Sequence, residues 1–191
     1  LYHYDKLNNK ITPISDEYTN VELVNFKDNK VIFAGRTFTD KQGLTSGLYV
    51  YDVKSQNLEV IVDKNLYDIS YANFIEDKII CALSDMKAYG VNENHKLYLI
   101  DSNKNITLLN DNDTWLSCTV GSDCRLGGGK SFKVIGNKLY FLATIAERVY
   151  LKSIDTNGKV EILSDKDGTI DFFDIANGEI YYVGMRDYTL Q

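Results

Sequence analysis

Two short sequence phrases alternate along the chain, and this repeat constrains the fold more than any other feature. The first phrase places a two-residue turn between two apolar stretches, and it occurs at residues 26–33, 74–81, 134–141 and 175–182. The turns read Asp-Asn, Glu-Asp, Gly-Asn and Asn-Gly. Such turns between β-branched and aromatic stretches are typical of β-hairpins. Each copy therefore predicts two antiparallel strands.

The second phrase is an aromatic-rich strand that ends in aspartate and is followed by a polar turn and a short apolar stretch. Its copies lie at residues 1–5, 48–52, 97–101 and 150–155. The closing aspartates, Asp5, Asp52, Asp101 and Asp155, are 47, 49 and 54 residues apart. An aspartate at a strand end can accept hydrogen bonds from backbone amides two residues further on. We therefore expect each aspartate to close the turn after its strand.

Hairpins that alternate with a period of about 40–60 residues indicate a β-propeller, in which each blade is a four-stranded antiparallel sheet. The predicted fold class is therefore all-β, a β-propeller fragment of about four blades. We expect residues 1–191 to form a single propeller segment, with an outer half-blade at 1–15, full blades at 20–63, 69–110 and 131–164, and an inner half-blade at 169–186.

Loop lengths distinguish the two faces of such a propeller. Turns between the first and second strands of a blade, and between the third and fourth, lie on one face, which we call the short-turn face. Connections between the second and third strands, and between blades, lie on the opposite face. The long segments, at residues 37–47, 84–96 and 111–130, all belong to this second group. Because long loops on a rigid scaffold commonly carry binding sites, we expect this long-loop face to be functional.

The most unusual segment, residues 115–125, contains the only tryptophan, two of the three cysteines and an Asp–Arg pair. Trp115, Asp123 and Arg125 are the candidate residues for contact with a substrate or a partner domain, and plain packing between blades is the alternative.

The three cysteines differ in their surroundings. Cys118 and Cys124 are close enough in sequence to form a disulfide, although we favour a reduced cytosolic protein. Cys81 lies in an apolar run and is expected to be a buried thiol.

Charge argues against nucleic-acid and membrane partners. The chain has 21 basic and 27 acidic residues, a net charge of −6 and a pI near 4.9. Nucleic-acid binding and attraction to anionic membranes both need a basic surface. The sequence also has no apolar run of about 20 residues, and no signal peptide is visible at its start. We therefore expect a cytoplasmic protein with no nucleic acid and no membrane among its partners.

Motifs for catalysis or cofactor binding are weak. The G-x-S-x-G string of α/β-hydrolases is absent, and the only histidines are His3 and His95. Residues 124–131 end like a phosphate-binding loop, but Cys124 replaces its first glycine and a strand is expected to follow. Residues 111–113 lack the remainder of a calcium-binding loop. We expect no catalytic residue, no metal and no cofactor here.

Three segments, residues 48–52, 84–90 and 120–125, resemble the non-catalytic propeller of the prolyl oligopeptidase family of serine peptidases. The nearest likeness within that family is to bacterial acylaminoacyl-peptidase-like enzymes, and the resemblance covers essentially the whole chain. It implies a propeller that caps a C-terminal α/β-hydrolase domain carrying Ser, Asp and His, and that restricts access to short peptides. This segment lacks that domain, so the resemblance assigns no catalytic residue to any position here.

The expected function is therefore that of a non-catalytic segment that gates and helps position short peptide substrates for the α/β-hydrolase domain of a parent serine peptidase. The expected partners are that domain, short peptides and, through the unpaired edges of the half-blades, the chain itself. The alternative is a stand-alone propeller that binds protein or carbohydrate through its long-loop face. An enzyme acting alone through that face is a third reading, which the absence of a visible catalytic constellation disfavours.

Overall fold

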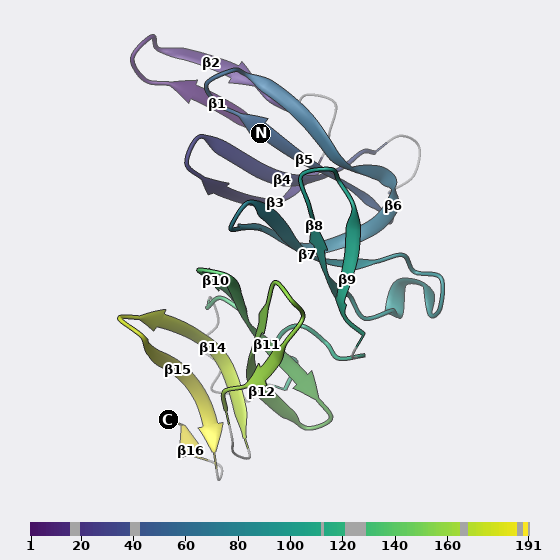
Figure 1. Cartoon of the computed structure of the whole chain (residues 1–191), viewed down its shortest axis with the longest axis vertical. Helices are drawn as coiled ribbons and strands as arrows, with labels where there is room; N and C mark the ends of the chain where they lie inside the picture. Colours follow the sequence, from purple (N-terminus) through teal and green to yellow (C-terminus); the bar gives the residue numbers. More distant parts are fainter. Residues whose placement is uncertain are drawn as a thin grey trace. The chain divides into compact units, whose positions relative to one another are not determined.

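The computed structural model describes residues 1–15, 20–38, 43–111, 113–120, 129–164, 168–186 and 189–190. In these residues the chain forms β-strands and one short 3-10 helix, η1 (Gly90–Asn92) (Figure 1). The chain divides into two compact units, Leu1–Leu108 and Leu109–Gln191, which are described separately.

The first unit contains a two-stranded hairpin and a run of seven strands in sequence order. The hairpin is β1 (Tyr2–Asp5) and β2 (Lys10–Pro13). The run consists of β3 (Asn20–Lys27), β4 (Lys30–Arg36), β5 (Ser46–Asp52), β6 (Asn57–Ile75), β7 (Lys78–Ser84), β8 (Lys96–Ile100) and β9 (Ile106–Asn110). The first part of β6 pairs with β5 and its second part pairs with β7. One continuous strand therefore serves as the last strand of one blade and the first strand of the next.

The second unit contains two sheets. The four-stranded sheet consists of β10 (Phe132–Ile135), β11 (Lys138–Ile145), β12 (Arg148–Asp155) and β13 (Val160–Ile162). The three-stranded sheet consists of β14 (Thr169–Ala176), β15 (Glu179–Arg186) and the short β16 (Thr189–Leu190), which pairs with the end of β15.

The four hairpins that the first phrase predicts are confirmed, as β3–β4, β6–β7, β10–β11 and β14–β15. Each turn has two residues, and the first of them has a positive φ: 55° at Asp28, 51° at Glu76, 58° at Gly136 and 53° at Asn177. Asn, Asp and Gly tolerate this conformation best, and tight hairpins require it, which explains the first turn residue in three of the four copies; Glu76 is the exception.

The turns that the second phrase predicts are confirmed as well. In each, the closing aspartate accepts a hydrogen bond from the amide two residues further on: Leu7 (3.0 Å), Lys54 (3.0 Å), Asn103 (2.9 Å) and Asn157 (2.9 Å). Hydrogen bonds within the turns lower the pKa of all four carboxyls. The largest effect comes from the Asn8 side chain at Asp5, the Ser55 amide at Asp52, the Asn105 side chain at Asp101 and the Lys159 amide at Asp155. These aspartates therefore act as structural turn residues.

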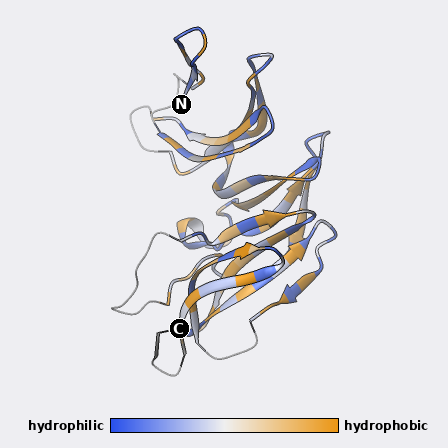
Figure 2. Ribbon diagram, turned by 90° about the vertical axis from the view of Figure 1, so that its left-hand side faces the viewer, coloured by the Kyte–Doolittle hydropathy of each residue, from blue (hydrophilic) through white to orange (hydrophobic). Residues whose placement is uncertain are grey.

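Each unit has its own apolar core, and Figure 2 shows hydrophobic residues along the strands of both. In the first unit, residues of β4 and β5 such as Ile32 and Leu48 form one cluster with Ile69 of β6 and Leu83 of β7. Cys81 is part of this cluster and is fully buried, as expected, and burial raises the pKa of its thiol. The facing surfaces of two neighbouring blades therefore build this core.

Candidate functional site

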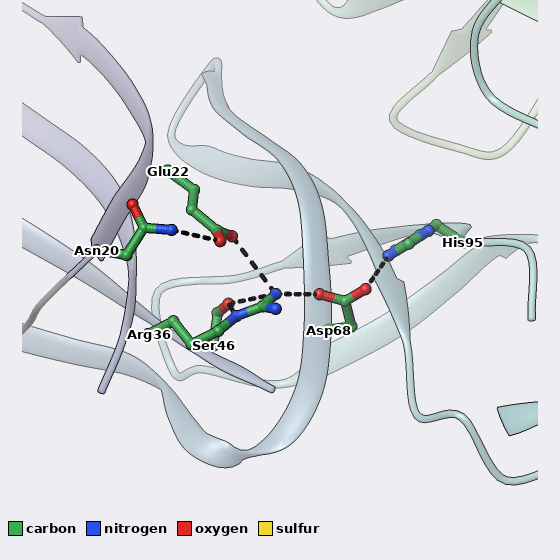
Figure 3. Close-up of polar contacts among 6 residues, drawn as sticks. All are labelled: Asn20, Glu22, Arg36, Ser46, Asp68 and His95. Carbon is green, nitrogen blue, oxygen red and sulfur yellow. Dashed lines mark hydrogen bonds and ion pairs between the residues drawn. The ribbon is translucent and has the colours of Figure 1, made fainter. Parts of the chain in front are cut away.

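A network of charged and polar side chains lies at the long-loop ends of the strands in the first unit (Figure 3). Arg36 ends β4, Ser46 begins β5, Asp68 lies in β6 and His95 immediately precedes β8. Arg36 and Ser46 flank the β4–β5 connection, and His95 lies at the end of the β7–β8 connection. Asp68 lies where β6 continues from one blade into the next. Two of the three long segments that the sequence singled out therefore meet at this network, and the third belongs to the second unit.

Asp68 is the centre of the network. Its Oδ1 accepts a hydrogen bond from Arg36 Nη2 at 2.8 Å, and its Oδ2 lies 3.2 Å from His95 Nε2. Because a carboxylate only accepts hydrogen bonds, His95 donates through Nε2. The carboxylate thus joins β4, β6 and the segment before β8, which belong to two neighbouring blades.

Partial burial strengthens these contacts. The side chains of Arg36 and His95 are 13% and 14% exposed, and that of Asp68 is 30% exposed. The hydrogen bond from His95 is the main factor that holds the pKa of Asp68 below its usual range, and the Arg36 charge adds to it against the opposing effect of burial. Asp68 is therefore ionised at neutral pH.

Glu22 and Ser46 complete the surroundings of Arg36. Arg36 Nη2 lies 3.4 Å from Glu22 Oε2, and both Nε and Nη2 lie 3.4 Å from Ser46 Oγ. Glu22 is the extra residue of a β-bulge in β3, between the pairs Val21↔Gly35 and Leu23↔Ala34. A bulge changes the direction of a side chain relative to a regular strand. Here it accompanies the contact of Glu22 with Arg36.

The network does not have the arrangement of a serine-hydrolase triad. A triad requires the serine hydroxyl to contact the histidine that the aspartate orients. Here the hydroxyl of Ser46 contacts Arg36, whereas His95 contacts Asp68. The contacts are those of a rigid, charged support for the surrounding loops.

Exposed apolar side chains occur on the same segments. Leu44 precedes β5, Leu66 lies in β6, and Tyr89 and Val91 lie in the β7–β8 connection, with exposed fractions between 53% and 71%. We call these four residues the apolar rim. Exposed apolar side chains can contribute to interaction surfaces, which makes these four residues candidates for contact with a partner.

In the second unit, the described part of the unusual segment is fastened to the end of β11. Thr144 N donates to Trp115 O at 2.9 Å, Thr144 Oγ1 donates to Ser117 O at 2.6 Å, and Thr119 N donates to Thr144 Oγ1 at 3.1 Å. Thr144 lies near the turn into β12, which is the long-loop end of this blade. Despite this anchoring, the Trp115 side chain remains 46% exposed.

The other candidates of this segment are only partly described. Cys118 is buried, and its Sγ lies 3.0 Å from Val120 O and 3.5 Å from Asp171 Oδ1. Asp123, Arg125 and Cys124 lie outside the described residues. Their roles, and a bridge between Cys118 and Cys124, stay predictions.

Sequence reasoning gave His95 no functional role and missed Arg36 and Asp68, and its choice of Trp115 as a contact residue stays a prediction. A usable signal was present, because Arg36 closes an otherwise apolar strand, and a charged residue at the end of a buried strand needs a partner. The partner was not identifiable, since Asp68 lies 32 residues further along the chain, in the next blade.

The short-turn face of the first unit carries a cleft of about 620 Å³ between the two blades. Two contacts span it: Lys27 Nζ donates to Glu76 O at 2.7 Å, and Lys104 pairs with Glu59 at 2.9 Å. Its lining includes five lysines and six carboxylates, so its charge selects neither anions nor cations. We therefore place the candidate site on the opposite face.

Within the described ranges, no His, Cys, Asp and Glu side chains gather in a group of three or more that could hold a metal ion. The described part of the chain also contains no helix long and apolar enough to cross a membrane.

The similarity of this chain to known proteins is seen in the structure and not in the sequence. No family model matches the sequence, and no curated protein matches it. Among solved structures, acylaminoacyl peptidase from Pyrococcus horikoshii superposes with a TM-score of 0.63 at 18% identity, covering 85% of this chain and 23% of that chain. The β-propeller domain of the Trilobed protease from Pyrococcus furiosus, described as having an open velcro topology, gives a TM-score of 0.65 at 16% identity over 97% of this chain and 55% of that chain. Puromycin hydrolase gives 0.66 at 10% identity over 94% and 27%.

The chain thus spans about a quarter to a half of the length of these structures. At such low identity the likeness concerns the fold. It confirms, at that level, the resemblance to the propellers of these peptidases that the sequence indicates. The chain therefore has a β-propeller fold, built from antiparallel blades like those of several peptidases.

Proposed function

We propose that this chain is the non-catalytic propeller segment of a serine peptidase of the prolyl oligopeptidase family, in which it gates and helps position short peptides for an α/β-hydrolase domain. The observation that carries the proposal is the shared fold with peptidase propellers over 85–97% of the chain. A cytoplasmic location is part of the proposal, and cell fractionation with immunodetection tests it.

The long-loop face has features suited to this role. The Arg36–Asp68–His95 network holds the loop ends of two blades together, and the apolar rim offers surface for a second domain. In the second unit, Trp115 offers a half-exposed aromatic side chain on an anchored segment. Large aromatic residues on rigid supports are common anchors of protein interfaces.

A steric filter needs no catalytic group of its own. Such a filter acts by excluding long or folded substrates, so it needs rigidity and shape rather than a nucleophile. Hydrogen-bonded loop ends supply rigidity, because each buried ionic contact fixes the geometry of the segments that it joins.

The coding sequence after Gln191 provides the first test. It is expected to encode a G-x-S-x-G string followed by Asp and His residues, the order of an α/β-hydrolase. A stop codon or an unrelated repeat at that place would contradict the proposal and favour a stand-alone binding propeller.

The second test uses the full-length parent protein. Tyr89→Ser in the apolar rim is expected to change kcat/KM for peptides in a length-dependent way, because it removes an exposed aromatic side chain from the proposed filter. Leu7→Ser is a matched control, since Leu7 is 96% exposed in the β1–β2 turn, away from this face. Equal length profiles for both variants and the unmodified enzyme would remove the rim from the proposed filter.

A further inference from the structure

The cleft on the short-turn face of the first unit has the size and the base of a ligand site. It lies between two neighbouring blades and is lined by residues of four turns, β3–β4, β5–β6, β6–β7 and β8–β9. Its volume of about 620 Å³ falls within the range of small-molecule sites, about 300–1,000 Å³. The apolar residues of the lining are buried or half-buried, so they form its base: Val50, Ile61, Phe74, Ile79 and Ile100. An apolar group of a ligand can therefore be buried there.

Contacts between the two blades fix this cleft at both ends. We call β3–β4 and β6–β7 the inner turns, because they join the first and second strands of each blade, and β5–β6 and β8–β9 the outer turns. Lys27 Nζ donates to Glu76 O at 2.7 Å at the inner end, and Lys104 Nζ lies 2.9 Å from Glu59 Oε1 at the outer end. These contacts therefore hold the two walls in fixed positions.

Two lysines of the lining are available to bind an anionic group. Lys30 begins β4 and faces Asp52, and Lys78, which begins β7, has the same position relative to Asp101. Each aspartate is already engaged, because it accepts hydrogen bonds from two backbone amides of its own turn, at 2.8–3.0 Å. The side chain of neither lysine forms an ion pair or a hydrogen bond with a described residue. Both ammonium groups therefore remain available to a ligand.

The second unit shows how such a lysine is neutralised. Lys138 begins β11, and its Nζ lies 2.7 Å from Glu161 Oε2 in the fourth strand, β13. Glu59 holds the same register position in β6, because each of these glutamates faces the residue two positions before the closing aspartate of the third strand. Glu59, however, pairs with Lys104 of the next blade. The contact at the outer end therefore leaves Lys30 without the carboxylate partner that its counterpart has.

The carboxylates that remain available lie at the inner end. Asp28, Glu76 and Asp77 are exposed residues of the inner turns, and their side chains have no partner among the described residues. At the outer end, the exposed side chain of Lys54 in the β5–β6 turn has no described partner either. Available carboxylates thus gather at the inner turns, and available ammonium groups lie at the starts of the second strands and at an outer turn.

This distribution suits a ligand that carries both charges. The inner and outer turns of one blade are two strand spacings apart, about 10 Å. Three residues of extended chain cover about 10 Å as well. We therefore propose that the cleft binds a short apolar peptide of about three residues whose two termini are free. The ammonium end lies at the inner turns beside Asp28 and Asp77, the side chains rest on the apolar base, and the carboxylate points toward Lys54.

The total charge of the lining agrees with this class of ligand. Five lysines and six carboxylates nearly balance, which disfavours simple anions and simple cations alike and favours a ligand with one charge of each sign. The inference does not rest on the proposed function, because the cleft lies on the face opposite the apolar rim and its occupation can be measured on this chain itself.

Titration of the whole chain with the tripeptide Leu-Ala-Leu, followed by the NMR chemical shifts of backbone amides, tests the proposal. The same peptide with an acetylated N-terminus or an amidated C-terminus, and triglycine, serve as comparison ligands. Lys54→Gln and Asp77→Asn each remove one of the proposed charges. Lys6→Gln is the matched control for the first, because Lys6 is an exposed lysine of the β1–β2 turn, and Glu147→Gln, in the exposed β11–β12 turn, is the control for the second.

We expect the free tripeptide to shift the amides of the four turns around the cleft. Blocking either terminus should raise the Kd by about 1.5- to 5-fold, the range for one exposed ion pair. Lys54→Gln should raise the Kd of the free peptide by a similar factor and leave that of the amidated peptide unchanged, and Asp77→Asn should spare the acetylated peptide in the same way. Triglycine should bind more weakly, because it has no apolar side chain for the base.

Three results would overturn the proposal. The first is that millimolar Leu-Ala-Leu leaves the amides of the four turns unshifted. The second is that either blocked peptide, or triglycine, binds as tightly as the free tripeptide. The third is that Lys54→Gln or Asp77→Asn binds all peptides as its control variant does.

Discussion

Strands β1 and β5 share four of five residues over positions 1–5 and 48–52, yet one is exposed and the other is buried. Their turns are the same, because Asp5 and Asp52 each accept hydrogen bonds from the amides two and three residues further on. Local structure therefore follows from the phrase itself. Burial depends on the neighbouring strands, which β5 has on both edges and β1 has on one.

The largest expected effect tests that difference directly. Tyr49→Ala should lower the free energy of unfolding by about 3–5 kcal/mol, because Tyr49 is buried and stacks on Phe33 with ring centroids 5.2 Å apart. The equivalent change Tyr2→Ala should cost less than about 0.5 kcal/mol, as expected for an exposed side chain. Urea unfolding followed by circular dichroism measures both. Equal losses would mean that β1 is as well covered as β5.

A second prediction concerns the contacts of Asp68 with Arg36 and His95, which join two neighbouring blades. Among the described residues, the β1–β2 hairpin has no contact of this kind. Asp68→Ala leaves Arg36 and His95, both mostly buried, without their shared carboxylate. The loss should be about 1–3 kcal/mol, the usual cost of leaving a buried hydrogen-bonding group without its partner. Glu22→Ala, which removes a 3.4 Å contact to Arg36 and an exposed hydrogen bond from Asn20 (2.8 Å), should cost clearly less in the same unfolding assay. The reverse order would show that Asp68 is not the centre of the network.

The third prediction is a pH dependence. The pKa of Asp68 is lower in the folded chain than in the unfolded chain. Its stabilising contribution is therefore complete above the ordinary aspartate pKa of about 4 and is lost as the pH falls through the folded value. Unfolding free energies of the unmodified chain and Asp68→Asn, measured between pH 7 and 3, should converge toward the acidic end. A constant difference across this range would contradict the assigned charge.

The smallest effect should come from the turn aspartates, and here β1 and β5 should behave alike. Asp5→Ala and Asp52→Ala each remove an acceptor for two backbone amides in an exposed turn. Both should lower the midpoint of thermal unfolding slightly, and Asn at either position should restore most of the loss, since its side-chain oxygen accepts the same hydrogen bonds. A loss at Asp52 that asparagine does not restore would indicate that charge, rather than turn closure, matters there.

The sequence was sufficient for those features that depend on neighbouring residues. The hairpin turns at Asp28 and Asn177, and the aspartate-closed turns, follow from short-range chemistry that the repeat makes visible. The burial of Cys81 followed from its apolar run. The pair of Arg36 and Asp68 was not predictable, because it depends on which blade ends meet across 32 residues of chain. The bulge at Glu22 was equally hidden, since nothing in the strand pattern marks the extra residue.

We propose that this propeller selects substrates for a peptidase and does no chemistry itself. Hydrolysis of acylated peptides of increasing length, measured with residues 1–191 alone and with the full parent protein, tests it most directly. We expect no turnover by the segment, and a parent activity that falls steeply with peptide length. Turnover by the isolated segment, or a parent that cleaves long and short peptides equally well, would contradict it.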